Sequence, residues 1–181
     1  RRQRRRGTTQ LGSLAVFSSK QSNIPEAADF VPPYGTLYRG ITVKSRGIEL
    51  EFGGKLADTL TVQGGVAHLF SVKSDAGDPV RTYIPRTTAN LSLRWKVMPR
   101  LTLGTAIRWQ DDIHLVNAVG TIRQGSYATV QLHGRYDFSE QLALTVNVGN
   151  ATNHKHVQSL YWDQAYYAAP RNVTAAIQWR F

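Results

Sequence analysis

The six residues Gly47-Ile48-Glu49-Leu50-Glu51-Phe52 decide the fold class. Ile48, Leu50 and Phe52 fall on one face of an extended chain, and the two glutamates fall on the other. An apolar and polar alternation with a period of two predicts a β-strand with one face in apolar surroundings and one face in water. The stretch therefore predicts a strand at a boundary between two environments.

The same alternation recurs along most of the chain. It is clear at 90–97, 101–110, 129–138, 142–148 and 172–181, and looser at 60–72 and 11–20. No window of comparable length has the apolar spacing of a helix. We therefore expect an all-β protein of eight antiparallel strands.

The connections between these windows alternate in length. Short polar turns are expected at 57–59, 98–100 and 139–141, and long connections at about 25–45, 74–85, 111–125 and 154–170. An up-and-down order with short turns at one end and long loops at the other is typical of outer-membrane β-barrels. We expect residues 11–181 to form strands of a transmembrane β-barrel.

The composition excludes several other classes of protein. Lys and Arg number 22 against 12 Asp and Glu, and five arginines lie among the first six residues of the 181. Residues 1–10 are therefore expected to be a basic leader, disordered or foreign to the barrel, with a phosphate-binding arm as the alternative. The rest is only mildly basic, which does not indicate a nucleic-acid-binding domain. The absence of cysteine excludes disulfides and thiolate sites, and no apolar run is long enough for a transmembrane helix.

Side chains of the two faces fit a membrane wall. Aromatic residues near strand ends share the apolar face: Trp95, Trp109, Tyr136, Phe138, Trp179 and Phe181. Such rings gather at membrane interfaces, although they also pack sandwich cores. The opposite face is rich in polar residues that suit a wet lumen and are costly to bury. On that face we expect Glu49, Glu51, Arg94, Arg108, Arg135 and Arg180.

Four motifs follow one another from about Gly40 onward. They are Val43-Lys44-Ser45-Arg46-Gly47-Ile48-Glu49-Leu50-Glu51, Ile84-Pro85-Arg86-Thr87, Asn147-Val148-Gly149-Asn150, and Ala169-Pro170-Arg171-Asn172-Val173 with the terminal Phe181. In this order the chain resembles the C-terminal barrel portion of a TonB-dependent siderophore receptor. It departs at 151–153, where the family usually has a leucine, an aromatic residue and an aspartate.

The resemblance implies a segment of a 22-stranded barrel in the outer membrane of a Gram-negative bacterium. It implies a receptor and transporter for a ferric siderophore, and no enzyme. The implied partners are the ferric siderophore, outer-membrane lipid, TonB acting through an N-terminal plug that these residues do not include, and the barrel-assembly machinery. The resemblance makes Phe181 part of the signal for that machinery. No cofactor is expected, because the iron arrives already chelated. No nucleic-acid partner is expected either.

The loop at 161–167 is rich in aromatic residues. Aromatic faces suit a bulky, partly apolar ligand such as a ferric siderophore. By the resemblance, Trp162 and Tyr166 are expected to bind it, with Tyr161 and His114 as further candidates in the long loops. The alternative is that these rings anchor the loops to the barrel rim or to lipid head groups.

Two polar segments of the sequence are considered as a metal site or a hydrolase site. Residues 111–114 and 154–156 hold carboxylates and imidazoles that can bind a cation, but neither group has further ligands nearby in the sequence, so no metal site is expected. His114 with an aspartate at 111 or 112 and Ser126 is the set that would suit a hydrolase.

Two other classes of protein remain open. One is a self-contained eight-stranded outer-membrane barrel with a structural, adhesive or enzymatic role, whose small lumen would be filled by side chains. The other is a soluble all-β binding module with a basic arm.

Overall fold

The structure, a computed structural model, describes residues 10–117, 120–161 and 164–181. Eight strands form one antiparallel sheet in chain order: β1 (Gln10–Val31), β2 (Gly35–Ala57), β3 (Leu60–Ser74), β4 (Thr87–Met98), β5 (Leu101–Gln110), β8 (Tyr127–Asp137), β9 (Leu142–Gly149) and β12 (Asn172–Trp179). Two separate hairpins pair β6 (Ile113–Asn117) with β7 (Gly120–Gln124), and β10 (Val157–Tyr161) with β11 (Gln164–Tyr167). The predicted all-β class and the eight antiparallel strands are confirmed.

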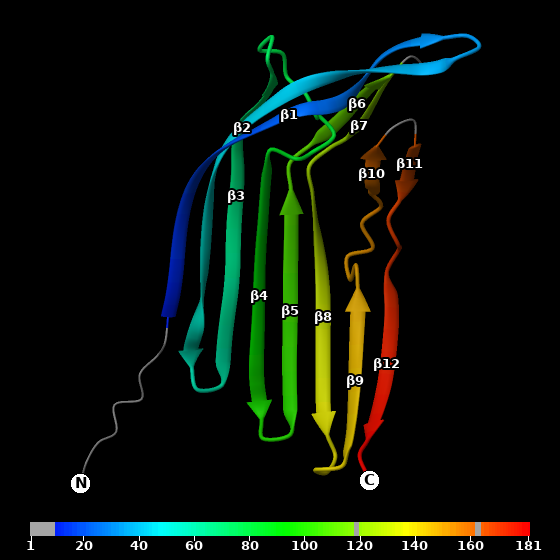
Figure 1. The fold of residues 1–181 in the computed structure, drawn as a ribbon. Helices are drawn as coiled ribbons and strands as arrows, with labels where there is room; N and C mark the ends of the chain where they lie inside the picture. Colours follow the sequence, from blue (N-terminus) through cyan, green and yellow to red (C-terminus); the bar gives the residue numbers. More distant parts are fainter. Residues whose placement is uncertain (1–9, 118–119, 162–163) are drawn as a thin grey trace.

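The three short turns lie where they were predicted. They join β2 to β3, β4 to β5 and β8 to β9 at one end of the sheet, called here the turn end (Figure 1). The opposite end, called the loop end, holds the longer connections. Among the described residues, none forms a helix with the length and apolarity needed to cross a bilayer.

The prediction of a long loop over 25–45 is wrong. Residues 24–31 and 35–41 continue β1 and β2 as a paired hairpin, closed by a turn at 32–34. The prolines had indicated a loop, but β1 is an edge strand, where Pro25 can lack an N–H without breaking an internal ladder. The connections at 111–125 and 154–170 likewise contain paired strands, whereas 75–86 is irregular apart from a bridge between Lys73 and Pro79.

A bulge bends the β1–β2 hairpin. The pairing shifts between Gln21 and Ile24, and Asn23 has a φ of 57°. A Cβ at Gly40 would overlap the carboxamide of Asn23 and lie 3.5 Å from its Cα, so Asn23 packs closely over Gly40 at the bend. Beyond the bend, the hairpin leans across the ends of the other strands (Figure 1).

Strand pairing separates the side chains into two faces as predicted. One row across the sheet is Leu14, Leu50, Val66, Ala89 and Trp109. A row on the other face is Glu51, Gly65, Asn90, Arg108 and Thr129. Arg94 and Arg135 share this polar face, as the sequence predicted. Arg94 lies an even number of positions from Asn90 on β4, and Arg135 an even number from Thr129 on β8, so their side chains point to the same face as those residues.

The apolar face is not covered by any other part of the described chain. Val16, Ile177 and Trp179 are each more than 70% exposed. A β-sandwich would bury this face against a second sheet, so the arrangement does not fit the soluble binding module.

The sheet is open. Its two edges are β1 and β12, and within the described ranges neither edge pairs with a further strand. The self-contained closed barrel is therefore not what the eight strands form here, since closure would pair β12 with β1.

Candidate functional site

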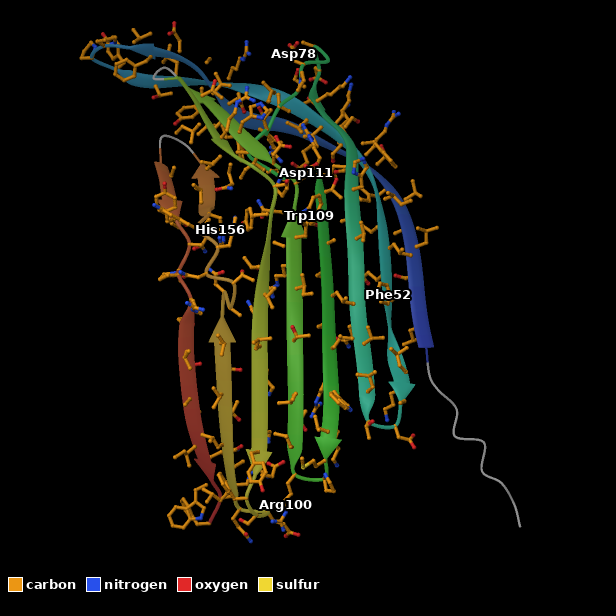
Figure 2. The ribbon with its side chains drawn as sticks, turned by 180° about the vertical axis from the view of Figure 1, so that it is seen from behind. Phe52, Asp78, Arg100, Trp109, Asp111 and His156 are labelled. Atoms are coloured by element: carbon orange, nitrogen blue, oxygen red, sulfur yellow. The ribbon has the colours of Figure 1, made fainter. Side chains whose placement is uncertain are left out.

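The loop end gathers the elements that offer a binding surface. These are the tip of the β1–β2 hairpin, the segment 75–86, the β6–β7 hairpin and the β10–β11 hairpin. Figure 2 places Asp78, Asp111 and His156 at this end of the sheet and Arg100 at the turn end. All the ligand-binding candidates from the sequence belong to these connections.

Aromatic candidates lie on the β10–β11 hairpin. Trp162 falls outside the described residues, and Tyr161 is placed only by its backbone, which pairs with Gln164. Tyr166 is 54% exposed and is available to a ligand. Its neighbour Tyr167 is more exposed still, and the Nζ of Lys155 lies 4.2 Å from the centre of its ring. This cation–π contact between the loop and β11 was missed by the sequence analysis.

His114 holds β6 against the segment 75–86. Its backbone N–H donates to Thr82 O at 3.1 Å, and Thr82 Oγ1 donates to His114 O at 2.7 Å. In the described chain no hydrogen bond or ring contact joins His114 to Tyr166. The structure therefore places both residues at the loop end without bringing them together.

Three rings stack below the β10–β11 hairpin. The Tyr127 ring lies 4.2 Å from that of His156 and 5.7 Å from that of His154, centre to centre. His156 is buried, and its Nδ1 donates to His154 O at 3.1 Å. The described residues contain no group of three or more His, Cys, Asp or Glu placed to hold a metal ion. The two histidines thus pack a loop base.

Asn150 holds together the two chain segments that flank the β10–β11 hairpin. Its Nδ2 donates to His154 O at 2.9 Å and to Ala169 O at 3.2 Å, and its Oδ1 accepts from the His154 N–H at 2.9 Å. The residue is 8% exposed and has a φ of 47°, which asparagine tolerates better than most residues. The second asparagine of the 147–150 motif therefore shapes the base of the β10–β11 hairpin.

The hydrolase arrangement considered from the sequence is not assembled. Asp111 Oδ1 accepts from the N–H of Asp112 at 2.9 Å, which is a local turn contact. Within the described ranges, no hydrogen bond links either aspartate or Ser126 to the His114 side chain. A nucleophile and base need such a link.

Charge also ties the segment 75–86 to β2. A hydrogen bond from Thr42, and then the nearby ammonium of Lys44, lower the pKa of Asp75 below its usual value. Lys44 Nζ lies 3.5 Å from Asp75 Oδ1. Both side chains are more than half exposed, so the link is weak.

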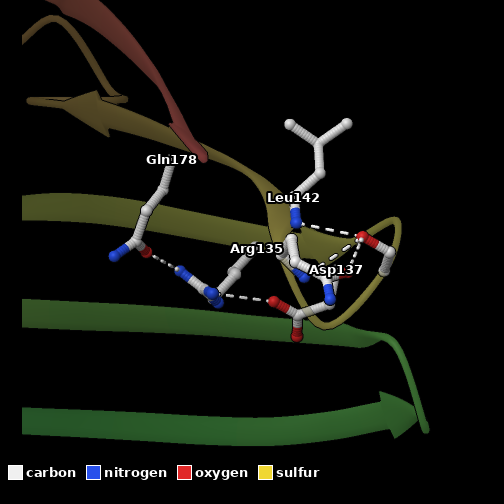
Figure 3. A network of polar contacts seen from close by, with 6 residues as sticks. Arg135, Asp137, Leu142 and Gln178 are labelled. Carbon is white, nitrogen blue, oxygen red and sulfur yellow. Dashed lines mark hydrogen bonds and ion pairs between the residues drawn. The ribbon is translucent and has the colours of Figure 1, made fainter. Parts of the chain in front are cut away.

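The polar face of the sheet carries charges of both signs. Glu49 and Glu51 were predicted to share a face with arginines, but no ion pair among the described residues joins either glutamate to an arginine. Arg135 instead contacts Asp137 at 2.7 Å and donates to Gln178 at 3.3 Å (Figure 3).

A family model and several curated proteins match this chain. The family model described as TonB dependent receptor-like, beta-barrel matches residues 4–151. The ferric-pyoverdine BN7/BN8 receptor of Pseudomonas putida is 30% identical over 93% of this chain and 20% of its own length. The ferripyoverdine receptor of Pseudomonas aeruginosa is 28% identical over 92% of this chain and 21% of its own length. The chain thus spans about one fifth of these curated relatives.

Solved structures agree with this match. The ferripyoverdine receptor of the outer membrane of Pseudomonas aeruginosa, bound to ferripyoverdine, aligns with a TM-score of 0.80 and 28% identity over 94% of this chain and 25% of that chain. A complex of FpvAI with pyocin S2 aligns with a TM-score of 0.81 and 28% identity, again over 94% of this chain and 25% of that one. The similarity therefore covers nearly all of this chain and about a quarter of each solved chain.

Proposed function

The chain belongs to the family of TonB-dependent receptor-like β-barrels, and we propose that it is part of the barrel wall of an outer-membrane receptor that takes up a ferric siderophore. The observation that supports this most directly is the open antiparallel sheet with one uncovered apolar face and one polar face. Relatives that share this wall are named as receptors for ferric pyoverdines. A pyoverdine-type siderophore is therefore the first ligand to test.

The strand lengths and aromatic residues support a place in the bilayer. β4, β5 and β8 have 12, 10 and 11 residues, close to the about 9–11 that cross the hydrocarbon region. At the turn end, Tyr136 packs edge-on against Phe138 and Trp179 against Phe181. Rings of this kind anchor a barrel at the membrane interface.

In the proposed receptor the loop end faces outward and binds the ligand. Tyr166 and Tyr167 offer exposed ring faces, and Lys155 adds a positive charge beside one of them. A ferric siderophore carries its own iron ligands, so the chain would supply ring contacts and charge rather than metal ligands or a cofactor. Energy would come from TonB through a plug domain outside these 181 residues.

Two further assignments belong to the same proposal. Phe181 follows the last strand, β12, with its ring exposed, which is compatible with recognition by the barrel-assembly machinery. Residues 11–181 would be the barrel segment. Gln10 already pairs with Gly54 as the first residue of β1, so it belongs to the strand, and 1–9 lie outside the described residues.

Uptake by cells tests the function. The full-length receptor containing this chain would be expressed in a Gram-negative strain that lacks its own siderophore receptors, with and without a functional TonB. We expect uptake of radioactive iron from ferric pyoverdine only when TonB is present. A receptor that reaches the outer membrane but neither binds nor imports any ferric siderophore of a broad panel would contradict the proposal.

Variants localise the binding surface. A double Tyr166→Ala and Tyr167→Ala change should weaken binding about tenfold, since buried aromatic contacts are frequent hot spots. Tyr136→Ala is the matched control, because that tyrosine lies at the turn end on the apolar face. Equal affinities of the two variants for the ferric siderophore would exclude the β10–β11 hairpin as the binding surface.

A further inference from the structure

Three lysines lie side by side toward the loop end, on the three strands at one edge of the sheet (Figure 1). Strand pairing sets Lys20 on β1 opposite Lys44 on β2, and Lys44 opposite Lys73 on β3. Directly paired residues of antiparallel strands project to the same face, so the three ammonium groups form one row, called here the lysine row, about 10 Å long between its outer Cα atoms. Like charges in opposite positions destabilise a sheet. An anion over the row would remove this repulsion.

The lysine row lies on the continuation of the apolar face. On β2, Arg46 and Lys44 lie an even number of positions from Ile48, so all three side chains point to the same face. Val43 and Val72, each next in sequence to a lysine of the row, point to the opposite face and are buried. The row is therefore on the side of the sheet that faces lipid in the proposed wall.

The row also lies just beyond the apolar band. From Ile48 to Leu56 the apolar positions of β2 extend for about 27 Å along the strand. The outward-facing apolar band of membrane barrels is about 25 Å tall, and a tilted strand of this length fills most of it. Arg46 is the next side chain on this face toward the loop end, and Lys44 is the one after it. These cations thus lie at the level of lipid head groups.

The positive charge of the row is only partly balanced. Among the described residues, the carboxylate in ion-pair contact with it is that of Asp75, whose Oδ1 lies 3.5 Å from Lys44 Nζ. In the same part of the chain, the other two lysines and Arg46 form no ion pair, and Asp78 forms none with the row. Four cations therefore face one paired carboxylate and remain available to an anion.

We propose that the lysine row, together with Arg46, binds the phosphate groups of a lipid head group in the outer leaflet around the receptor. Phosphate oxygens accept hydrogen bonds from several ammonium groups at once, and the flexible stem of lysine extends its charge to the head-group level. Ser18 and Ser71, the two cross-strand partners of Arg46, add hydroxyl donors beside the row. The inference rests on the proposed place of the apolar face in the outer membrane, and not on the identity of the siderophore.

A lipid is favoured over a soluble anion because apolar side chains adjoin the charges. Ile48 pairs with His68 on β3, and the ring of Phe70 packs edge-on against that of His68 with centres 5.1 Å apart. Phe70 is 63% exposed, so the apolar surface continues up to the charged groups. Acyl chains against Phe70 and Ile48 would bring the phosphates of the same lipid level with Arg46 and the lysine row.

The test uses the full-length receptor that contains this chain, purified in a neutral detergent. Native mass spectrometry measures binding of diphosphoryl lipid A, of zwitterionic phosphatidylcholine and of inorganic phosphate. One variant changes all three lysines of the row to glutamine, and a second changes them to arginine, which keeps the charge. The matched control changes Lys55, Lys96 and Arg100 to glutamine, which removes the same number of exposed charges at the turn end.

We expect wild type, the arginine variant and the turn-end control to bind lipid A alike, and to bind phosphatidylcholine more weakly. The glutamine variant of the row should bind lipid A about a hundredfold more weakly, the product of about fivefold for each lysine at an anionic lipid surface. The proposal is overturned if that variant binds lipid A as tightly as the turn-end control, or if wild type binds phosphatidylcholine equally well. Binding of inorganic phosphate without lipid A would overturn it in favour of a soluble anion.

Uptake of ferric pyoverdine by the same variants separates this proposal from the proposed function. Because the lysine row lies on the outside of the wall, its glutamine variant should import the siderophore at the wild-type rate. A receptor that binds lipid A through the row but imports no ferric siderophore would contradict the proposed function and leave the lipid site intact. A receptor that imports the siderophore but fails the lipid test would contradict the lipid site alone.

Discussion

Arg135 and Asp137 lie two positions apart on β8, and a contact of 2.7 Å between Nη2 and Oδ1 joins them on the polar face of the sheet. The same guanidinium donates through Nη1 to Gln178 on β12 at 3.3 Å (Figure 3). Strand β9 runs between β8 and β12. One side chain therefore links both neighbours of β9 at the turn end.

The first prediction concerns this link. Arg135→Gln should lower the free energy of unfolding by about 1 kcal/mol, because both members of the pair are partly exposed and exposed ion pairs contribute little. Asp137→Asn should cost less, since the contact with Gln178 remains. Denaturant unfolding of the detergent-solubilised receptor measures both changes and the double variant. Strictly additive losses would mean that the contact contributes nothing to stability.

The second prediction concerns Gly64 on the apolar face. A Cβ there would lie 2.5 Å from Cζ of Phe52 and 2.9 Å from the backbone oxygen of Asn90. Gly64→Ala should therefore destabilise the wall by about 1–3 kcal/mol, because the backbone atom cannot move aside. Gly134→Ala is the control on the same face, where the nearest atom is 3.7 Å away. If both variants unfold at the same denaturant concentration, the ring over Gly64 does not constrain the sheet.

The third prediction concerns Asn150. Asn150→Ala removes three hydrogen bonds from a buried site. It leaves Ala169 O and the His154 N–H without this partner, while His154 O keeps its contact with Nδ1 of His156. We expect a loss of about 2–3 kcal/mol, confined to the base of the β10–β11 hairpin. Hydrogen exchange of 154–169 should accelerate while that of β9 stays slow. Asn153→Ala, which removes one bond to Arg171, should have a smaller effect; an equal effect would contradict the assignment.

The fourth prediction concerns pH. The pKa of Asp75 is lowered from 3.8, first by Thr42 and then by Lys44. A carboxyl whose pKa is lower in the folded state stabilises the fold above its unfolded pKa, and this contribution disappears as the pH falls through the lowered value. The link between 75–86 and β2 should thus persist near pH 4 and weaken only below 3.8. Pepsin cleavage of this segment, compared with Asp75→Asn at each pH, measures it; a constant ratio would contradict the prediction.

The strands of the barrel wall could be predicted from the sequence because a strand between lipid and water has alternating apolar and polar residues. The window at 47–52 shows this alternation directly, and a short turn before β5 separates two such strands. The hairpins β6–β7 and β10–β11 lie outside the main sheet, lack the alternation and were predicted only as loops. The extension of β1 and β2 over 24–41 was not predicted for a different reason. Pro25 usually indicates the end of a strand, but an edge strand tolerates a proline because its outward N–H needs no partner.

The contacts of the loop end could not be predicted. Tyr127 meets His156, and Lys155 meets Tyr167, only because Asn150 folds the intervening chain back. Neither pair has a recognisable spacing in the sequence. The family resemblance selected residues by type, so it named Tyr166 and did not name Lys155, which lies over the ring of the neighbouring Tyr167.

The bend at Asn23 gives the β1–β2 tip a degree of independence from the wall. The bulge and Gly40 set the direction of the overhang, so the turn at 32–34 can change in length or sequence without disturbing the strands below. Tyr34, at the tip, is 83% exposed. In the proposed orientation this turn is a suitable place to insert an epitope tag or to raise a nanobody, which would report on the receptor in intact cells.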